Sequence, residues 1–175
     1  MNLFLKRWAI TVIALVTMSV AVCAQQKGDK AVGVDLVVNS AATGDEEFVR
    51  VGLSGKFKYN VSDPLRVEGV LTLFAKQEYA TTFDLSVNAH WLIPVAGDKL
   101  FVYPLAGLGA YTVRYSGDGY SDSESRIGIN IGGGADFKVN DRLSINYEYK
   151  YKVISLEESY FAKISQISIG VAIKF

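Results

Sequence analysis

The chain has 175 residues, half of them hydrophobic, and its 18 basic residues are matched by 18 acidic ones. This length favours a single domain. No cluster of basic residues stands out along the sequence, which excludes the electrostatic surface that nucleic-acid binding requires. A single cysteine, Cys23, excludes an intramolecular disulfide framework.

The first 24 residues predict a signal peptide. Lys6 and Arg7 precede an uncharged run that ends at Val22, and Ala24 then offers a small residue for cleavage. Without Lys6 and Arg7, 16 basic residues face 18 acidic ones, a net charge of about −2. An N-terminal membrane anchor is the alternative, but this run is short for a span of about 20 residues. Lipid attachment at Cys23 is a further alternative, which Val22 in front of it disfavours.

Apolar and polar residues alternate along most of the remaining domain, residues 25–175. Period-two alternation over this length predicts strands whose two faces meet different surroundings. The clearest case is the hairpin of residues 126–152, with Ile, Phe and Tyr on one parity and Gly, Asn and charged residues on the other. Eight strands are expected, at about Lys30–Asn39, Phe48–Asn60, Pro64–Lys76, Ala80–Leu92, Lys99–Tyr115, Arg126–Lys138, Leu143–Lys152 and Lys163–Phe175.

The links between these strands alternate in length. Residues 61–63, 95–98 and 140–141 form short, turn-like links. The other links, at residues 40–47, 77–79, 116–125 and 155–162, include longer polar runs. Short turns at one end and longer loops at the other are typical of barrels that cross an outer membrane.

Three architectures fit eight alternating strands. In a soluble barrel or a sandwich the apolar face points inward, whereas in a membrane barrel it points to lipid. Aromatic residues near both strand ends, with aliphatic residues between them, favour the membrane barrel, because Tyr and Trp are stable at headgroup level. Two outward girdles are predicted, formed by Phe57, Tyr59, Trp91, Phe101, Tyr103, Phe137 and Phe175 at one end and by Phe83, Tyr111, Tyr115, Tyr149 and Tyr151 at the other.

The predicted fold is therefore an all-β, eight-stranded, antiparallel up-and-down transmembrane barrel with an apolar exterior and a polar, plugged lumen. Eight strands leave an interior that side chains can fill. Enclosed charges are costly unless they are paired, so a connected network is expected inside. Its predicted members are Asp35, Arg50, Glu68, Asp84, Arg114, Arg126, Asp136, Glu148 and Lys150, with Arg66 and Lys138 beside them.

Three segments resemble a known family. The hairpin IGINIGGGADFKVNDRLSINYEYKY and the segment YPLAGLGAY are similar to corresponding strands of small outer-membrane barrels of the OmpA/OmpX type. The final ISIGVAIKF resembles the C-terminal strand that the barrel assembly machinery recognises in such proteins. The resemblance covers the domain after the signal peptide and implies barrel construction, not a specific chemistry. A peptidoglycan-binding domain such as that of full-length OmpA is not expected.

Catalytic and metal sites have weak support in the sequence. His90 is the only histidine, and its parity places it on the lumen side, the wrong face for a lipid substrate; Ser86 lies too far along the strand to contact it. One histidine and no cysteine after residue 24 make a poor metal site. Asp118, Asp122 and Glu124 do not have the spacing of a calcium loop. We expect no cofactor, no metal and no catalytic residue.

The function expected is that of a non-enzymatic integral protein of the Gram-negative outer membrane, acting in envelope integrity or in surface interaction through extracellular loops. Its expected partners are outer-membrane lipid, lipopolysaccharide and, through the strand ending at Phe175, the barrel assembly machinery. A monomer is expected, because a closed barrel has no free edge. The alternatives are a lipid-modifying outer-membrane enzyme and a soluble exported barrel that binds an apolar ligand.

Overall fold

A computed structural model describes residues 27–43, 46–76, 80–97, 99–117, 120–157 and 160–175. The expected signal peptide lies outside these residues, as does the predicted link at residues 77–79. The described chain forms nine strands: β1 Lys30–Thr43, β2 Glu46–Asn60, β3 Leu65–Phe74, β4 Ala80–Trp91, β5 Ile93–Pro94, β6 Leu100–Gly117, β7 Tyr120–Lys138, β8 Leu143–Glu157 and β9 Tyr160–Lys174.

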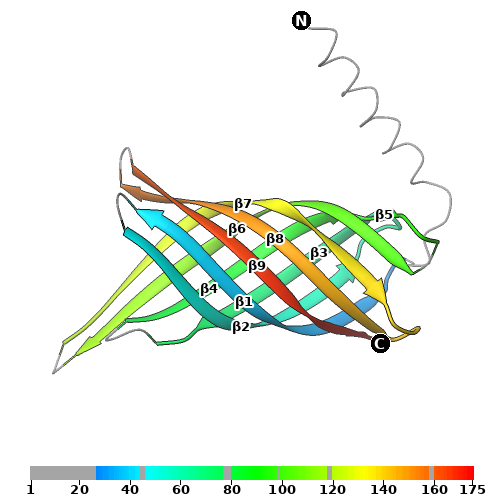
Figure 1. Ribbon diagram of the computed structural model, residues 1–175, viewed down its shortest axis with the longest axis horizontal. Helices are drawn as coiled ribbons and strands as arrows, with labels where there is room; N and C mark the ends of the chain where they lie inside the picture. The colour runs from blue at the N-terminus through cyan, green and yellow to red at the C-terminus, as the bar shows by residue number, and fades with distance from the viewer. Residues whose placement is uncertain (1–26, 44–45, 77–79, 98, 118–119, 158–159) are drawn as a thin grey trace, which may run out of the picture.

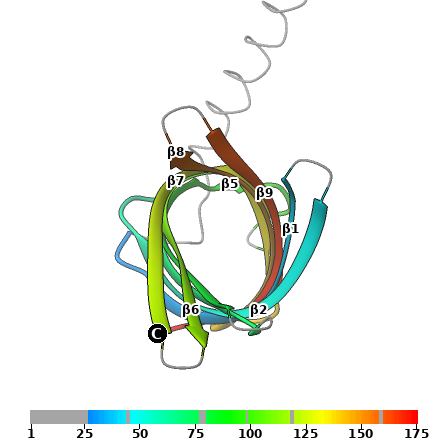
Figure 2. The same cartoon turned by 90° about the vertical axis from the view of Figure 1, so that its left-hand side faces the viewer.

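These strands close into one antiparallel barrel. Each long strand pairs with its neighbours in the chain, β1 pairs with β9, and β4 pairs with β6 to complete the ring. The two-residue β5 follows β4 after a break at Leu92 and pairs with the start of β6, so the barrel has eight walls. Figure 1 shows the tilted strands from the side, and Figure 2 shows them closed around the interior.

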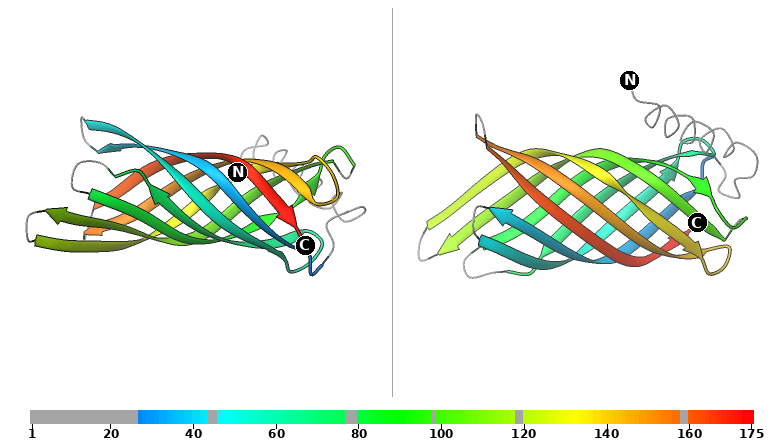
Figure 3. Two further views of the ribbon diagram at one scale, coloured as in Figure 1. Left: turned by 90° about the horizontal axis from the view of Figure 1, so that it is seen from below. Right: turned by 45° about the horizontal axis from the view of Figure 1, so that its top comes forward.

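The two ends of the barrel differ. The C-terminus, β5 and the turns that follow β2, β5 and β7 lie at one end, which we call the turn end (Figure 1). The β1–β2, β6–β7 and β8–β9 hairpins project from the other, the hairpin end (Figure 3). None of the described residues belongs to a helix long and apolar enough to span a membrane.

The apolar parity points out of the barrel. Val34, Leu53, Val87 and Ile129 lie mid-strand and are between 54% and 59% exposed. Asp35, next to Val34, is 1% exposed. Burial of the polar parity and exposure of the apolar one is the reverse of a soluble barrel or sandwich. The predicted outward apolar face is confirmed, and the ligand-binding soluble barrel is wrong.

Three of the expected long links are mostly strand. β1 and β2 stay paired up to Thr43 and Glu46, and β6 and β7 up to Gly117 and Tyr120. The β8–β9 ladder continues to the pair Glu157 and Tyr160, past a register shift. The alternation ends earlier than the strands because, beyond the apolar belt, water contacts both faces of the ladder while the backbone hydrogen bonds continue.

Candidate functional site: the lumen charge network

The lumen contains as many acidic as basic side chains among its deeply buried residues. Among the residues that the structure describes, five carboxylates and five cations are each at most 5% exposed. We call them the lumen charge network; they are Asp35, Glu68, Asp84, Asp136 and Glu148 with Lys56, Lys58, Arg66, Lys150 and Lys152. They come from six strands and reach the interior because the polar parity points inward. Equal numbers fit an enclosed site, in which an unpaired charge is costly.

Asp136 organises the part of the network nearest the turn end. Its Oδ1 lies 3.1 Å from the Lys58 Nζ, and Arg66 donates to its Oδ2. Arg66 also donates to His90 Nδ1, with Nη2 at 3.0 Å, and its guanidinium lies 4.8 Å from the centre of the Tyr103 ring. The Asp136 carboxylate thus binds two cations, and one of them, Arg66, also contacts His90 on β4 and Tyr103 on β6.

Deeper in the lumen, His90 faces two carboxylates. Its Nε2 lies 3.7 Å from Glu68 Oε1 and 3.9 Å from Glu148 Oε2, and its ring stacks on Tyr103 at 4.5 Å. The Tyr103 hydroxyl donates to Glu148 Oε2 at 3.1 Å, while the Lys150 Nζ lies 2.8 Å from Glu148 Oε1. The cluster is therefore tied to cations and a phenol as well as to the imidazole.

Glu68, His90 and Glu148 place one potential ligand atom each within 4.8 Å of one another, a spacing that a metal ion could use. The donor set argues against it. Arginine has only N–H donors, so His90 Nδ1 accepts from Arg66 and a neutral ring carries its proton on Nε2, the atom that would have to bind the metal. Metal-binding histidines instead donate from their second nitrogen. The arrangement fits a hydrogen-bonded histidine better than a metal ligand.

Towards the hairpin end, paired polar groups give way to apolar side chains. Lys152 pairs with Asp84, which also accepts from the Ser86 hydroxyl at 3.0 Å. Asn146 donates to Asp35, whose other partner, Lys56, also lies 3.5 Å from Glu68 Oε2 and links this pair to the cluster around His90. Beside these groups, Val37, Val70, Phe74, Ile154 and Ile164 are buried in the lumen. Side chains fill the interior across these levels, as expected for eight strands.

The predicted network residues divide into two groups. Asp35, Glu68, Asp84, Asp136, Glu148 and Lys150 lie in the buried network. Arg50 lies on β2 near the hairpin end, is half-buried, and donates to the Thr82 hydroxyl. Arg114 is exposed opposite Thr81 of β4, and Arg126 pairs with the exposed Glu124, so both lie outside the network.

The prediction left out three cations of the network: Lys56, Lys58 and Lys152. All three stand on the polar parity of their strands, next to residues that were correctly placed inside. Parity was therefore a sufficient signal for them. Position along the strand was the missing information for Arg126, since inward parity buries a side chain only within the closed part of the barrel. Arg114 was assigned to the wrong face, because it lies opposite the exposed Thr81 on the outward parity of β6.

The aromatic girdles are partly wrong. Phe57, Tyr59, Phe137, Tyr149 and Phe175 are exposed on the outside, and Phe83, Trp91 and Tyr151 are half-buried on the same parity. The four aromatic residues assigned from β6 are not outward, since Phe101, Tyr103, Tyr111 and Tyr115 all stand on its lumen parity.

The physical reason for this error is the composition of β6. Its middle is apolar or small on both parities, so periodicity there does not define a face. Backbone pairing does: Tyr111 lies opposite the inward Asp84, and Tyr103 lies opposite Gly134. A Cβ atom at Gly134 would come within 2.7 Å of the Tyr103 ring, so the glycine makes the space that the ring occupies.

Comparisons with known proteins agree with this architecture. The family model described as outer membrane protein beta-barrel domain matches residues 10–175. Among solved structures, Neisserial surface protein A is 16% identical with a TM-score of 0.73, covering 83% of this chain and 97% of that one. Ail of Yersinia pestis, the attachment invasion locus protein, is 19% identical with a TM-score of 0.62, covering 86% of this chain and 100% of that one.

The N-terminal barrel domain of Pseudomonas aeruginosa OprF is 15% identical with a TM-score of 0.62, again covering 86% of this chain and all of that one. At these identities the likeness concerns the fold. A comparison with curated protein sequences gave no match.

Proposed function

The chain belongs to the outer membrane protein beta-barrel domain family, and from this premise we propose that it is a non-enzymatic integral outer-membrane protein that supports envelope integrity or surface interaction. The observation that carries the proposal is the contrast between an apolar exterior and a filled, charge-balanced lumen. Such a barrel is stable in a bilayer and leaves its lumen closed to solutes. The projecting hairpins at the hairpin end are then its extracellular surface.

A catalytic role has little support from the surroundings of the only histidine. His90 is fully buried, its Nδ1 accepts from Arg66, and its Nε2 faces two carboxylates. A general base for ester hydrolysis needs a free ring nitrogen within reach of a nucleophile. The Ser86 hydroxyl donates to Asp84 instead. The lipid-modifying enzyme therefore remains the weaker proposal, to be tested by lipid turnover in vesicles with the wild type and His90→Ala.

The proposed partners follow from the exterior of the barrel. The exposed aliphatic belt is suited to lipid, and the hairpin end would meet lipopolysaccharide in the outer leaflet. At the opposite end, Phe175 is 71% exposed, and its N–H donates to the Lys30 carbonyl at 3.0 Å, where β9 meets β1. We propose that this strand is the segment that the barrel assembly machinery recognises, and that the finished barrel is a monomer.

Planar bilayer recordings test the closed lumen. After reconstitution, we expect no stable conductance above the bilayer background, because buried side chains occupy the cross-section. A variant that empties part of the lumen, Tyr103→Gly with Phe101→Gly, is the positive control for detecting a channel. A large, long-lived conductance of the wild type would overturn the proposal, as would recovery of the mature protein from the periplasmic fraction instead of the outer membrane.

Envelope integrity and surface interaction are separated by a deletion strain. Loss of the envelope role predicts higher sensitivity to detergent and bile salts, restored by the wild-type gene. A surface role predicts unchanged sensitivity and reduced binding of cells to immobilised host glycans or matrix proteins. Replacing residues 116–121 with a short turn would shorten the projecting β6–β7 hairpin without removing residues that pair with β4, and should reduce the second phenotype without affecting the first.

A further inference from the structure

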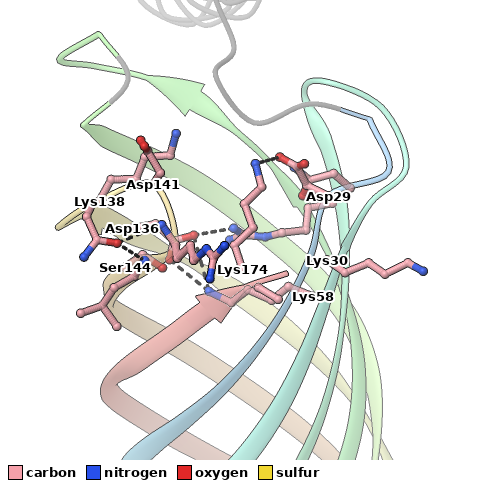
Figure 4. Close-up of a pocket in the computed structure, with 14 residues that line it drawn as sticks. Asp29, Lys30, Lys58, Asp136, Lys138, Asp141, Ser144 and Lys174 are labelled. Carbon is pink, nitrogen blue, oxygen red and sulfur yellow. Dashed lines mark hydrogen bonds and ion pairs between the residues drawn. The ribbon is translucent and has the colours of Figure 1, made fainter.

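A pocket at the turn end opens below the lumen charge network. It has a volume of about 460 Å³, counting the part open to solvent, and is bounded by the start of β1, the β7–β8 turn and the end of β9. Asp136, Lys58 and Arg66 form its inner wall, so the pocket meets the network directly. Figure 4 shows the side chains gathered around it. We call this pocket the turn-side mouth.

The turn-side mouth is cationic, unlike the network above it. Its lining holds six cations against three carboxylates, Asp29, Asp136 and Asp141. The cations are Lys30, Lys58, Arg66, Lys138, Arg142 and Lys174. The difference is a formal charge of about +3 within one small pocket. A surplus of this size attracts anions to a concave site, where field lines are concentrated.

Two of the three carboxylates are already engaged. Asp136 is held by both Lys58 and Arg66, and Asp29 lies 2.6 Å from the Lys174 Nζ. Asp136 shows how this mouth holds an oxyanion, with two cations converging on one carboxylate. When Asp136 is set against Lys58 and Arg66, and Asp29 against Lys174, the lining still has more positive than negative charge. Arg142 and Lys138, on either side of the β7–β8 turn, contribute to this positive surplus.

The backbone around the mouth is held in place. Asn140 Oδ1 accepts from the N–H groups of Arg142 and Leu143 at 2.9 and 2.8 Å, which closes the β7–β8 turn. The Lys174 N–H donates to the Arg142 carbonyl at 2.7 Å and joins this turn to the end of β9. A site whose backbone is fixed before binding loses less entropy when a ligand binds.

We propose that the turn-side mouth binds a phosphate group, supplied either by a soluble phosphorylated molecule or by the headgroup of an anionic phospholipid. A phosphate carries between one and two negative charges near neutral pH and offers several acceptor oxygens, which suits a surplus of lysine and arginine donors. This binding is additional to the proposed function. The proposed function places the mouth on the periplasmic side of the membrane, and only this location rests on it; the soluble-ligand measurement below does not depend on it.

The test uses the full mature chain in phosphatidylcholine nanodiscs with inorganic pyrophosphate as the soluble probe. Amide NMR shifts of residues 140–144 report binding at the turn. The test variant is Lys138→Gln with Arg142→Gln, two positions of the lining outside the buried network. One control variant, Arg114→Gln with Arg126→Gln, removes two cations at the opposite end. A second control is Lys30→Gln, whose side chain extends away from Asp136 in Figure 4.

We expect saturable shifts with the wild type and both controls, and an affinity at least about tenfold weaker in the test variant, since two charge-assisted contacts are lost. A second series replaces pyrophosphate with phosphatidylglycerol in the nanodisc. Shifts that appear only there, and are absent in the test variant, assign the site to a lipid headgroup.

The proposal is overturned if neither probe shifts these amides, or if the test variant binds as tightly as the wild type. Equal weakening in the Arg114→Gln/Arg126→Gln control would also overturn it, because it would show attraction by overall charge. Heat-modifiable gel mobility, measured on every variant, reports whether the barrel is folded. A failure of the proposed function would appear as conductance or mislocalisation, which are measured separately.

Discussion

The lumen charge network and the turn-side mouth are adjacent, share Lys58, Arg66 and Asp136, and are charged in different ways. The network balances five acids with five bases, whereas the rest of the mouth's lining, without the three shared residues, holds four cations against two carboxylates. The difference follows from access to water. Buried charges lose hydration and have to be paired to be tolerated, while charges at an open mouth are solvated and screened. Stability alone therefore requires equal numbers of acidic and basic groups in the network, whereas an excess of positive charge is tolerated only at the mouth.

The largest effect is expected where one carboxylate serves two cations. Asp136→Ala leaves Lys58 and Arg66 buried without their shared partner and should lower the free energy of unfolding by about 3–5 kcal/mol. Urea unfolding in lipid vesicles measures it. Asp141→Ala, an exposed acid in the lining of the mouth, is the matched control and should change it by less than about 0.5 kcal/mol. Similar values for both variants would contradict the distinction between the two regions.

A second prediction concerns pairing itself. Lys152→Met leaves Asp84 as a buried charge without its lysine and should cost about 3 kcal/mol of unfolding free energy. Lys152→Met combined with Asp84→Leu removes both charges and should recover most of that loss, because well-packed apolar residues can replace a buried ion pair. If the double variant is no more stable than the single one, balance is not what the network requires.

Packing in the lumen gives a smaller effect. Gly134→Ala would place a Cβ atom 2.7 Å from the Tyr103 ring and from the Tyr147 carbonyl, and should cost about 1–3 kcal/mol. Gly55→Ala, on the outside with no atom within 4 Å of the added carbon, is the control and should be nearly neutral. The same unfolding titration distinguishes them. Equal costs would mean that strand propensity, and not the space for Tyr103, decides the result.

The smallest effect is expected at the mouth. Lys138→Gln with Arg142→Gln reduces the cationic surplus without leaving any member of the lumen charge network unpaired. We expect the free energy of unfolding to change by less than about 0.5 kcal/mol, as for other solvated positions. A loss of several kcal/mol would show that these cations belong to the structural network, and would remove the contrast from which phosphate binding is inferred.

Most of the barrel wall could be predicted because strand periodicity is a local signal. Val34 and Asp35 are neighbours in sequence and point to opposite sides, and the same alternation correctly oriented every strand except β6. The hairpin lengths were underestimated because alternation reports a difference between two surroundings, and that difference ends before the backbone pairing does.

The candidate site was predicted less completely. Asp136 and Glu148 could be placed inside from parity, but the convergence of Lys58 and Arg66 on Asp136 joins residues 70 or more positions apart. The position of His90 between two carboxylates likewise depends on three strands. No local pattern encodes such contacts.

By itself, the sequence determined which side chains share a face, because a strand turns successive residues to opposite sides. It also determined that the two faces need different solvents. Only the tertiary structure decided how far each strand extends, which face of β6 is inward and which charges meet. Ring closure sets the register between distant strands, and that register brings Tyr103 opposite Gly134 and surrounds the turn-side mouth with cations from β1, β2, β3, β7, the β7–β8 turn and β9.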